Sequence, residues 1–89
     1  MTLTEFVLAV DRYRILTNAS VTSWFRTADH NKAVGGVERS PHLTGLGVDV
    51  VYDADTEDPK TRVLTGFILG LKVISENDHD HIQPSDLKV

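Results

Sequence analysis

The chain contains no cysteine, and this limits how so short a sequence can be stabilised. With 89 residues it has room for one domain, and a domain of this size buries only roughly 60–65% of its unfolded surface. Disulfide bonds and thiolate metal sites are both excluded. A metal that stabilises the thin core must therefore be held by histidine and carboxylate ligands.

Charge and hydropathy exclude two classes of partner. The net charge is −4, and the nine Lys and Arg residues are scattered along the chain, so the basic patch that binds nucleic acid phosphates is missing. No apolar run approaches the ~20 residues that span a bilayer. The N-terminus has no basic region typical of a signal peptide. We therefore predict a chain without membrane insertion that stays cytoplasmic until something else releases it.

The first half of the chain predicts a helix, a strand and a long loop. Apolar residues recur about every three positions over residues 3–16, which favours an amphipathic helix capped by Thr2 or Thr4. Residues 21–25 are β-branched and aromatic and predict a strand. Residues 27–45 are rich in Asn, Gly, Ser and Pro and predict a loop.

The second half predicts three further strands and a second helix. Residues 46–52 alternate as a strand does, with Asp49 opposite the apolar row. The acidic residues 53–58 predict a solvated turn rather than a calcium loop, because the glycine turn and the distal Glu are missing. A helix follows from Pro59 to about residue 69, and residues 72–76 and 79–83 predict short strands. This order indicates a small α+β fold with an antiparallel sheet.

Three of the four histidines lie in two polar clusters, residues 40–49 and 76–81. A zinc hydrolase needs about three His and carboxylate ligands, with a fourth position for water. His42, Asp49 and one late histidine meet that requirement. Gly45 and Gly47 between the first two permit the bends of a loop that enters a strand beside a metal. By spacing alone, an ordinary junction between a loop and a strand is the better explanation of this segment.

Four segments in this order resemble the peptidase M15 family of zinc D-alanyl-D-alanine carboxypeptidases and endolysins. They are Ser23-Trp-Phe-Arg26, His30-Asn-Lys-Ala-Val-Gly-Gly36, Ser40-x-His42-x-x-Gly45-x-Gly47-x-Asp49 and Asp78-x-x-His81-Ile-Gln83. The resemblance implies a single minimal domain over residues 1–89 with the α+β zinc fold shared by hedgehog domains and DD-peptidases.

The same resemblance implies roles for individual residues. His42, Asp49 and His81 would hold Zn²⁺, Asp78 would act as the general base, and Arg26 would polarise the scissile carbonyl. Without the resemblance, Arg26 would be interpreted as a surface arginine and Ser40 as an ordinary loop hydroxyl. With the resemblance, we expect the Ser40 hydroxyl to form a hydrogen bond to a zinc ligand. The chain departs from the family in two ways: Gly47 stands where Ala is commoner, and the short chain leaves little room for a substrate-binding wall. These departures bear on substrate specificity more than on metal binding.

The closing motif fits the chain in two overlapping registers. Asp78 precedes His81 by three residues, and Glu76 precedes His79 by three. We favour His81 and Asp78, because Ile82 after His81 is able to anchor the strand in the core and Asp80 after His79 is not. His79 and Glu76 are then expected beside the ligands or at the rim of the cleft.

These features predict a zinc peptidase that cuts stem peptides of bacterial peptidoglycan, with an endolysin or virion-associated role preferred. The alternative is a non-catalytic zinc-stabilised module of the same fold, which binds a partner or forms part of a virion. A carboxylate placed to act on the zinc-bound water separates the two hypotheses, and both Asp78 and Glu76 are available.

Overall fold

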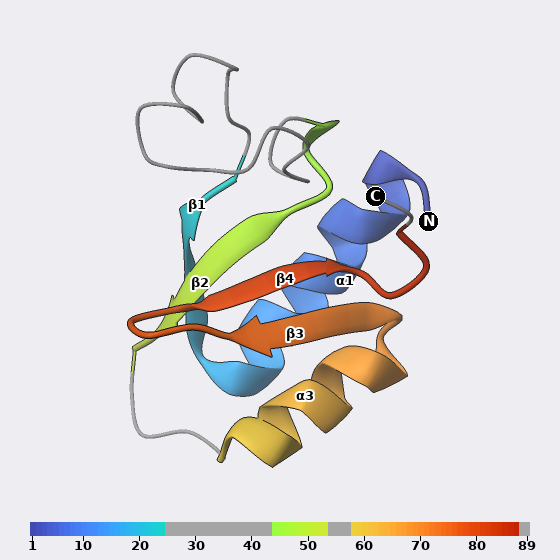
Figure 1. Ribbon diagram of the computed structural model, residues 1–89. Helices are drawn as coiled ribbons and strands as arrows, with labels where there is room; N and C mark the ends of the chain where they lie inside the picture. The colour runs from blue at the N-terminus through green and yellow to red at the C-terminus, as the bar shows by residue number, and fades with distance from the viewer. Residues whose placement is uncertain (25–43, 54–57, 88–89) are drawn as a thin grey trace.

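The computed structural model describes residues 1–24, 44–53 and 58–87, and these ranges form an α+β fold with a four-stranded antiparallel sheet (Figure 1). The strand order is β1-β2-β4-β3. The elements are α1 (Leu3–Thr17), β1 (Ala19–Ser23), β2 (Val48–Tyr52), α3 (Pro59–Ile68), β3 (Leu71–Ser75) and β4 (Asp80–Pro84). The predicted fold class is confirmed. No helix within the described ranges is long and apolar enough to cross a membrane.

Helix α1 begins and ends at residues that satisfy its terminal backbone groups. Thr2 is the N-cap: its side chain accepts from the Glu5 amide, and the Glu5 carboxylate accepts from the Thr2 amide. Asn18 ends the helix with φ 55 and turns the chain directly into β1. The predicted helix is confirmed, with Thr2 rather than Thr4 as its cap.

Helix α3 follows the prediction closely. Asp58 accepts a hydrogen bond from the Thr61 amide at 2.9 Å, and Pro59 occupies the first helical position. After Ile68 the chain leaves the helix through Gly70, which has φ 80. Asp58, the last of the acidic residues 53–58 that we predicted to form a solvated turn, is therefore the N-cap of α3.

The predicted strand at residues 21–25 is wrong by two positions, since β1 runs from Ala19 to Ser23. The left-handed turn at Asn18 starts the strand early, and Ala19 pairs with Tyr52. Trp24 lies beyond the strand, where its ring meets Phe6 edge-on at 5.9 Å and its indole N–H donates to the Gly45 carbonyl at 2.8 Å. Trp24, whose aromatic side chain made this segment resemble a strand, thus packs against the core from outside the strand.

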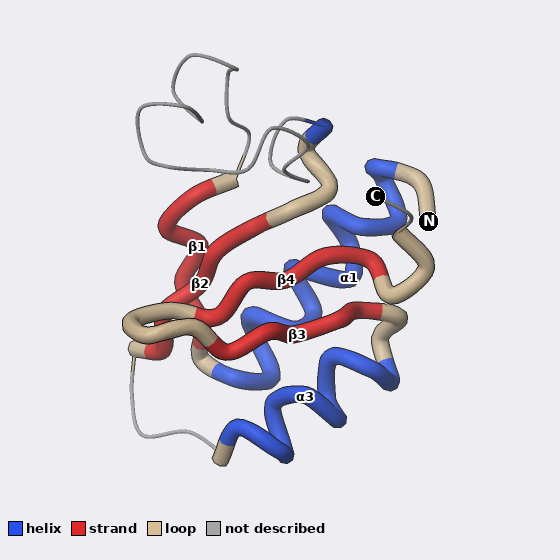
Figure 2. The backbone as a smooth tube through the Cα atoms, in the orientation of Figure 1, coloured by secondary structure: helices blue, strands red, loops and turns tan. Residues whose placement is uncertain are grey.

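The hydrophobic core lies between the helices and one face of the sheet. In Figure 1, α1 lies behind the sheet and α3 runs beside the edge strand β3 (the tube of Figure 2 shows the same arrangement). The buried side chains of the core come from α1 and all four strands: Phe6, Ala9, Val10, Tyr13, Ala19, Val48, Val50, Leu71, Val73 and Ile82. Because successive side chains alternate between faces, Asp49 and His81 must point to the opposite face.

Gly66 allows α3 to lie directly against β3. A Cβ at this position would overlap Cγ2 of Val73, and valine has little rotamer freedom with which to move. A glycine in a helix normally gains about 0.5–1 kcal/mol on replacement by alanine. Here we expect Gly66→Ala to lower the free energy of unfolding by about 1–3 kcal/mol, because overpacking outweighs that gain. Urea denaturation measures the change.

The control is Leu64→Ala, an exposed position on the same helix, whose free energy of unfolding is expected within about 0.5 kcal/mol of the wild type. A Gly66→Ala variant more stable than the wild type would show that α3 does not pack directly against Val73 of β3.

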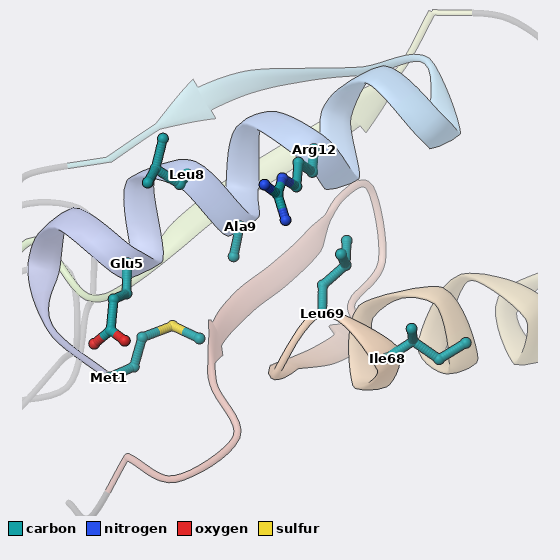
Figure 3. Close-up of a pocket in the computed structure, with 7 residues that line it drawn as sticks. All are labelled: Met1, Glu5, Leu8, Ala9, Arg12, Ile68 and Leu69. Carbon is teal, nitrogen blue, oxygen red and sulfur yellow. The ribbon is translucent and has the colours of Figure 1, made fainter.

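A groove of about 310 Å³ lies on the helical side of the molecule. It is formed by α1 and the end of α3, and Figure 3 shows Ala9 and Arg12 of α1 pointing toward Leu69. Of the predicted zinc-binding and catalytic residues that the structure describes, which are Asp49, Asp78 and His81, none lines it. The candidate site lies on the other face of the sheet.

Candidate metal centre

Pairing of β2 with β4 brings two of the predicted zinc ligands together. Asp49 is directly opposite His81 in the antiparallel register, and residues directly opposite share a face of the sheet. The His81 ring nitrogen Nδ1 lies 3.2 Å from Asp49 Oδ1. The side chain of His81 is only 11% exposed, and that of Asp49 is 14% exposed. The two residues, which are 32 positions apart, thus form a largely buried imidazole–carboxylate pair.

His79 reaches the same carboxylate from the turn before β4. Its Nε2 lies 3.7 Å from Asp49 Oδ1 and 3.3 Å from Glu76 Oε2. Its Nδ1 lies 2.6 Å from Asp78 Oδ1. The four residues of the two overlapping registers are thus linked to Asp49 by pairwise contacts through His79 and His81, and the structure leaves both registers geometrically possible.

The charges of this cluster shift two pKa values. The hydrogen bond to Asp78 raises the pKa of the His79 imidazole; partial burial opposes this rise, and the charges of Asp49 and Glu76 add to it. The same hydrogen bond, with the charge of His79, holds the pKa of Asp78 below its usual range. Asp78 is 89% exposed, so it faces solvent as an ionised carboxylate at neutral pH.

The donor chemistry of the cluster fits part of a zinc site. Imidazole nitrogen and carboxylate oxygen are the ligands that zinc takes when thiolates are absent. Across residues 1–24, 44–53 and 58–87, no three His, Asp or Glu side chains converge closely enough to hold a metal ion. The pair formed by Asp49 and His81 therefore needs a further ligand.

Several predicted site residues lie outside the described ranges. They are Arg26, Ser40 and His42, all within residues 25–43. The described residues on either side of this segment are joined by the hydrogen bond from Trp24 to Gly45. Gly45 has φ 78, which is the bend predicted between His42 and Asp49.

A buried polar network lies behind His81, and the sequence did not predict it. Asp80 is 3% exposed, and its Oδ2 accepts from the Tyr52 hydroxyl at 2.6 Å and from Arg62 Nε at 3.0 Å. The Tyr52 hydroxyl also lies 2.7 Å from that of Tyr13, and the Arg62 guanidinium stacks 4.6 Å from the centre of the Tyr52 ring. The network joins β4 to β2, α1 and α3.

Our expectation that Asp80 cannot anchor a strand in the core is wrong. Asp80 and Ile82 are two positions apart in β4, so both point to the core face. The Arg62 charge and the Tyr52 hydroxyl stabilise the buried carboxylate. Burial and the hydrogen bond to Asp80 raise the pKa of Tyr52 well above its usual value, so the hydroxyl remains a donor. Strand alternation was the available clue: an acid on the core face requires a buried partner.

The fold and the cluster define a small α+β domain that presents histidines and carboxylates on the sheet face opposite its helices. Comparison with known families agrees with the chemistry of this face: the sequence model of Peptidase M15 matches residues 5–83. The chain belongs to the Peptidase M15 family. Comparisons with curated proteins and with solved structures found no match. Family membership indicates a metallopeptidase-like hydrolase with a peptide as its substrate.

Proposed function

We propose that this chain is a zinc metallopeptidase that hydrolyses a peptide bond in peptidoglycan stem peptides, of the D,D-carboxypeptidase or endolysin type. The observation that carries the proposal is the Asp49–His81 pair on one sheet face of a Peptidase M15 domain. A role in an endolysin or a virion, acting on the bacterial cell wall, accords with this substrate.

His42, Asp49 and His81 would hold the zinc. Bound zinc supplies a nucleophile, by lowering the pKa of its water to around 7, and polarises the substrate carbonyl. Asp49 and His81 lie together on β2 and β4, which supports the proposal because the sheet would hold these two ligands in place before metal binds. Their small exposure keeps bulk water away from the pair, which strengthens electrostatic interactions at this point.

Asp78 is the proposed general base, and Arg26 the proposed partner of the carbonyl oxygen. The lowered pKa keeps Asp78 ionised at neutral pH, which is the state that accepts a proton. An arginine near the carbonyl would stabilise the negative charge that develops on its oxygen, an effect worth several kcal/mol for one well-aimed group.

The choice between the two registers has a direct test in four variants. We expect His81→Ala to lose zinc, and Asp78→Asn to keep zinc while turnover falls by about 10²–10⁴-fold, because proton transfer loses its acceptor. His79→Ala and Glu76→Gln are the matched controls and should keep zinc, with smaller losses of turnover. Zinc content and hydrolysis are measured on each. The opposite pattern, with zinc lost in His79→Ala and turnover lost in Glu76→Gln, would place the site one register earlier.

Hydrolysis itself is tested by incubating the zinc-loaded protein with purified peptidoglycan and analysing the soluble fragments by mass spectrometry. We expect fragments shortened at a stem-peptide bond, and none when a chelator is present. Zinc binding without any released fragment would instead favour a non-catalytic zinc-stabilised binding or virion module.

A further inference from the structure

Both ring nitrogens of His81 have a defined neighbour. Nδ1 faces Asp49 Oδ1 at 3.2 Å, and Nε2 lies 3.0 Å from Gln83 Oε1. Gln83 is two residues along β4 and therefore on the same face as His81. It is half-buried, and β4 is an inner strand between β2 and β3. His81 is paired with Asp49 on β2 and with Ile74 on β3, and Gln83 is paired with Lys72 on β3.

A histidine that binds a metal uses the lone pair of one nitrogen and carries its proton on the other. The group that accepts this second N–H fixes the tautomer and the orientation of the ring. We propose that Gln83 is the positioning residue for His81: its side-chain carbonyl accepts the Nε2–H and so leaves the Nδ1 lone pair directed to the side of Asp49. This inference rests on the proposed function, in which His81 holds zinc.

The proposal depends on an acceptor at position 83, and not only on a side chain of the right size. Glutamate is of nearly the same size and presents only acceptors when ionised, whereas methionine is of similar length and has no carbonyl. A purely structural role would tolerate the apolar methionine at least as well as the charge. Lys72 is directly opposite Gln83 on β3 and is exposed, so Lys72→Met is the matched control.

Zinc affinity of the full chain is measured by competition with a chromophoric chelator. We expect Gln83→Met to weaken zinc binding by about 10–100-fold. Gln83→Glu and Lys72→Met are expected to keep a zinc affinity within about threefold of that of the wild type, a change smaller than this loss. Melting temperatures in the presence of excess chelator check that each variant folds without metal. A second readout is the ¹⁵N NMR spectrum of His81 in the zinc-loaded protein, in which we expect the proton on Nε2.

The outcomes separate this inference from the proposed function. If the wild type binds zinc and Gln83→Met binds it equally tightly, or if Gln83→Met and Gln83→Glu lose affinity equally, the role of Gln83 is overturned while the zinc site stands. A zinc-loaded His81 with its proton on Nδ1 overturns it as well. If the wild type binds no zinc, the proposed function fails, and the role of Gln83 with it.

Discussion

Replacing Asp80 by alanine is expected to lower the free energy of unfolding by about 3–5 kcal/mol, the usual cost of breaking a buried ion pair. The change removes the carboxylate that binds both Tyr52 and Arg62. The Arg62 side chain is only 15% exposed, so water replaces the lost partner poorly. Small domains have about 5–15 kcal/mol of stability in total, and the variant would therefore lose a large part of it.

Because Asp80→Ala could leave too little folded protein to measure, Asp80→Asn is the second variant. It keeps an acceptor for Tyr52 and removes the charge beside Arg62, and we expect a loss of about 1–3 kcal/mol. Asp11→Asn is the matched control, since Asp11 forms an exposed ion pair with Arg14 and such pairs contribute about 0–1 kcal/mol. Equal losses in Asp80→Asn and Asp11→Asn, measured by urea denaturation, would show that the network does not hold the core.

Removing His42 is expected to abolish both zinc binding and hydrolysis. A ligand that binds only the folded state at 100 times its dissociation constant adds about 2.7 kcal/mol to the free energy of unfolding. We expect zinc to stabilise the wild type by this amount and His42→Ala not at all. The measurement is thermal unfolding with and without zinc, paired with digestion of peptidoglycan.

His30→Ala is the control for this result, because His30 is the histidine that lies outside both clusters. We expect it to bind zinc and to gain the same stability as the wild type. An unchanged response of His42→Ala to zinc would remove His42 from the ligand set, and equal losses in both variants would point to an effect on folding.

Local chemistry made much of the fold predictable. The helices α1 and α3 begin at capping residues, Thr2 and Asp58, and carry apolar residues at helical spacing, so short windows of sequence were sufficient. The bounds of β1 were missed because Trp24 looks like part of a strand by composition. A side chain that packs from outside a strand cannot be distinguished by residue type alone.

The candidate site was predictable in part for the same reason. Alternation placed Asp49 opposite the apolar row, and β2 bears this out. The direct pairing of Asp49 with His81 depends on which strands are neighbours, and one sequence does not contain that information. Asp80 was misjudged because its stability in the core comes from Arg62 and Tyr52, residues that are distant in sequence.

The zinc stoichiometry of the purified wild-type chain tests the central claim most directly. The protein is incubated with zinc, dialysed against metal-free buffer and analysed by elemental mass spectrometry. We predict one zinc ion per chain, held by His42, Asp49 and His81. A chain that retains no zinc after this treatment would contradict the assignment of a zinc peptidase.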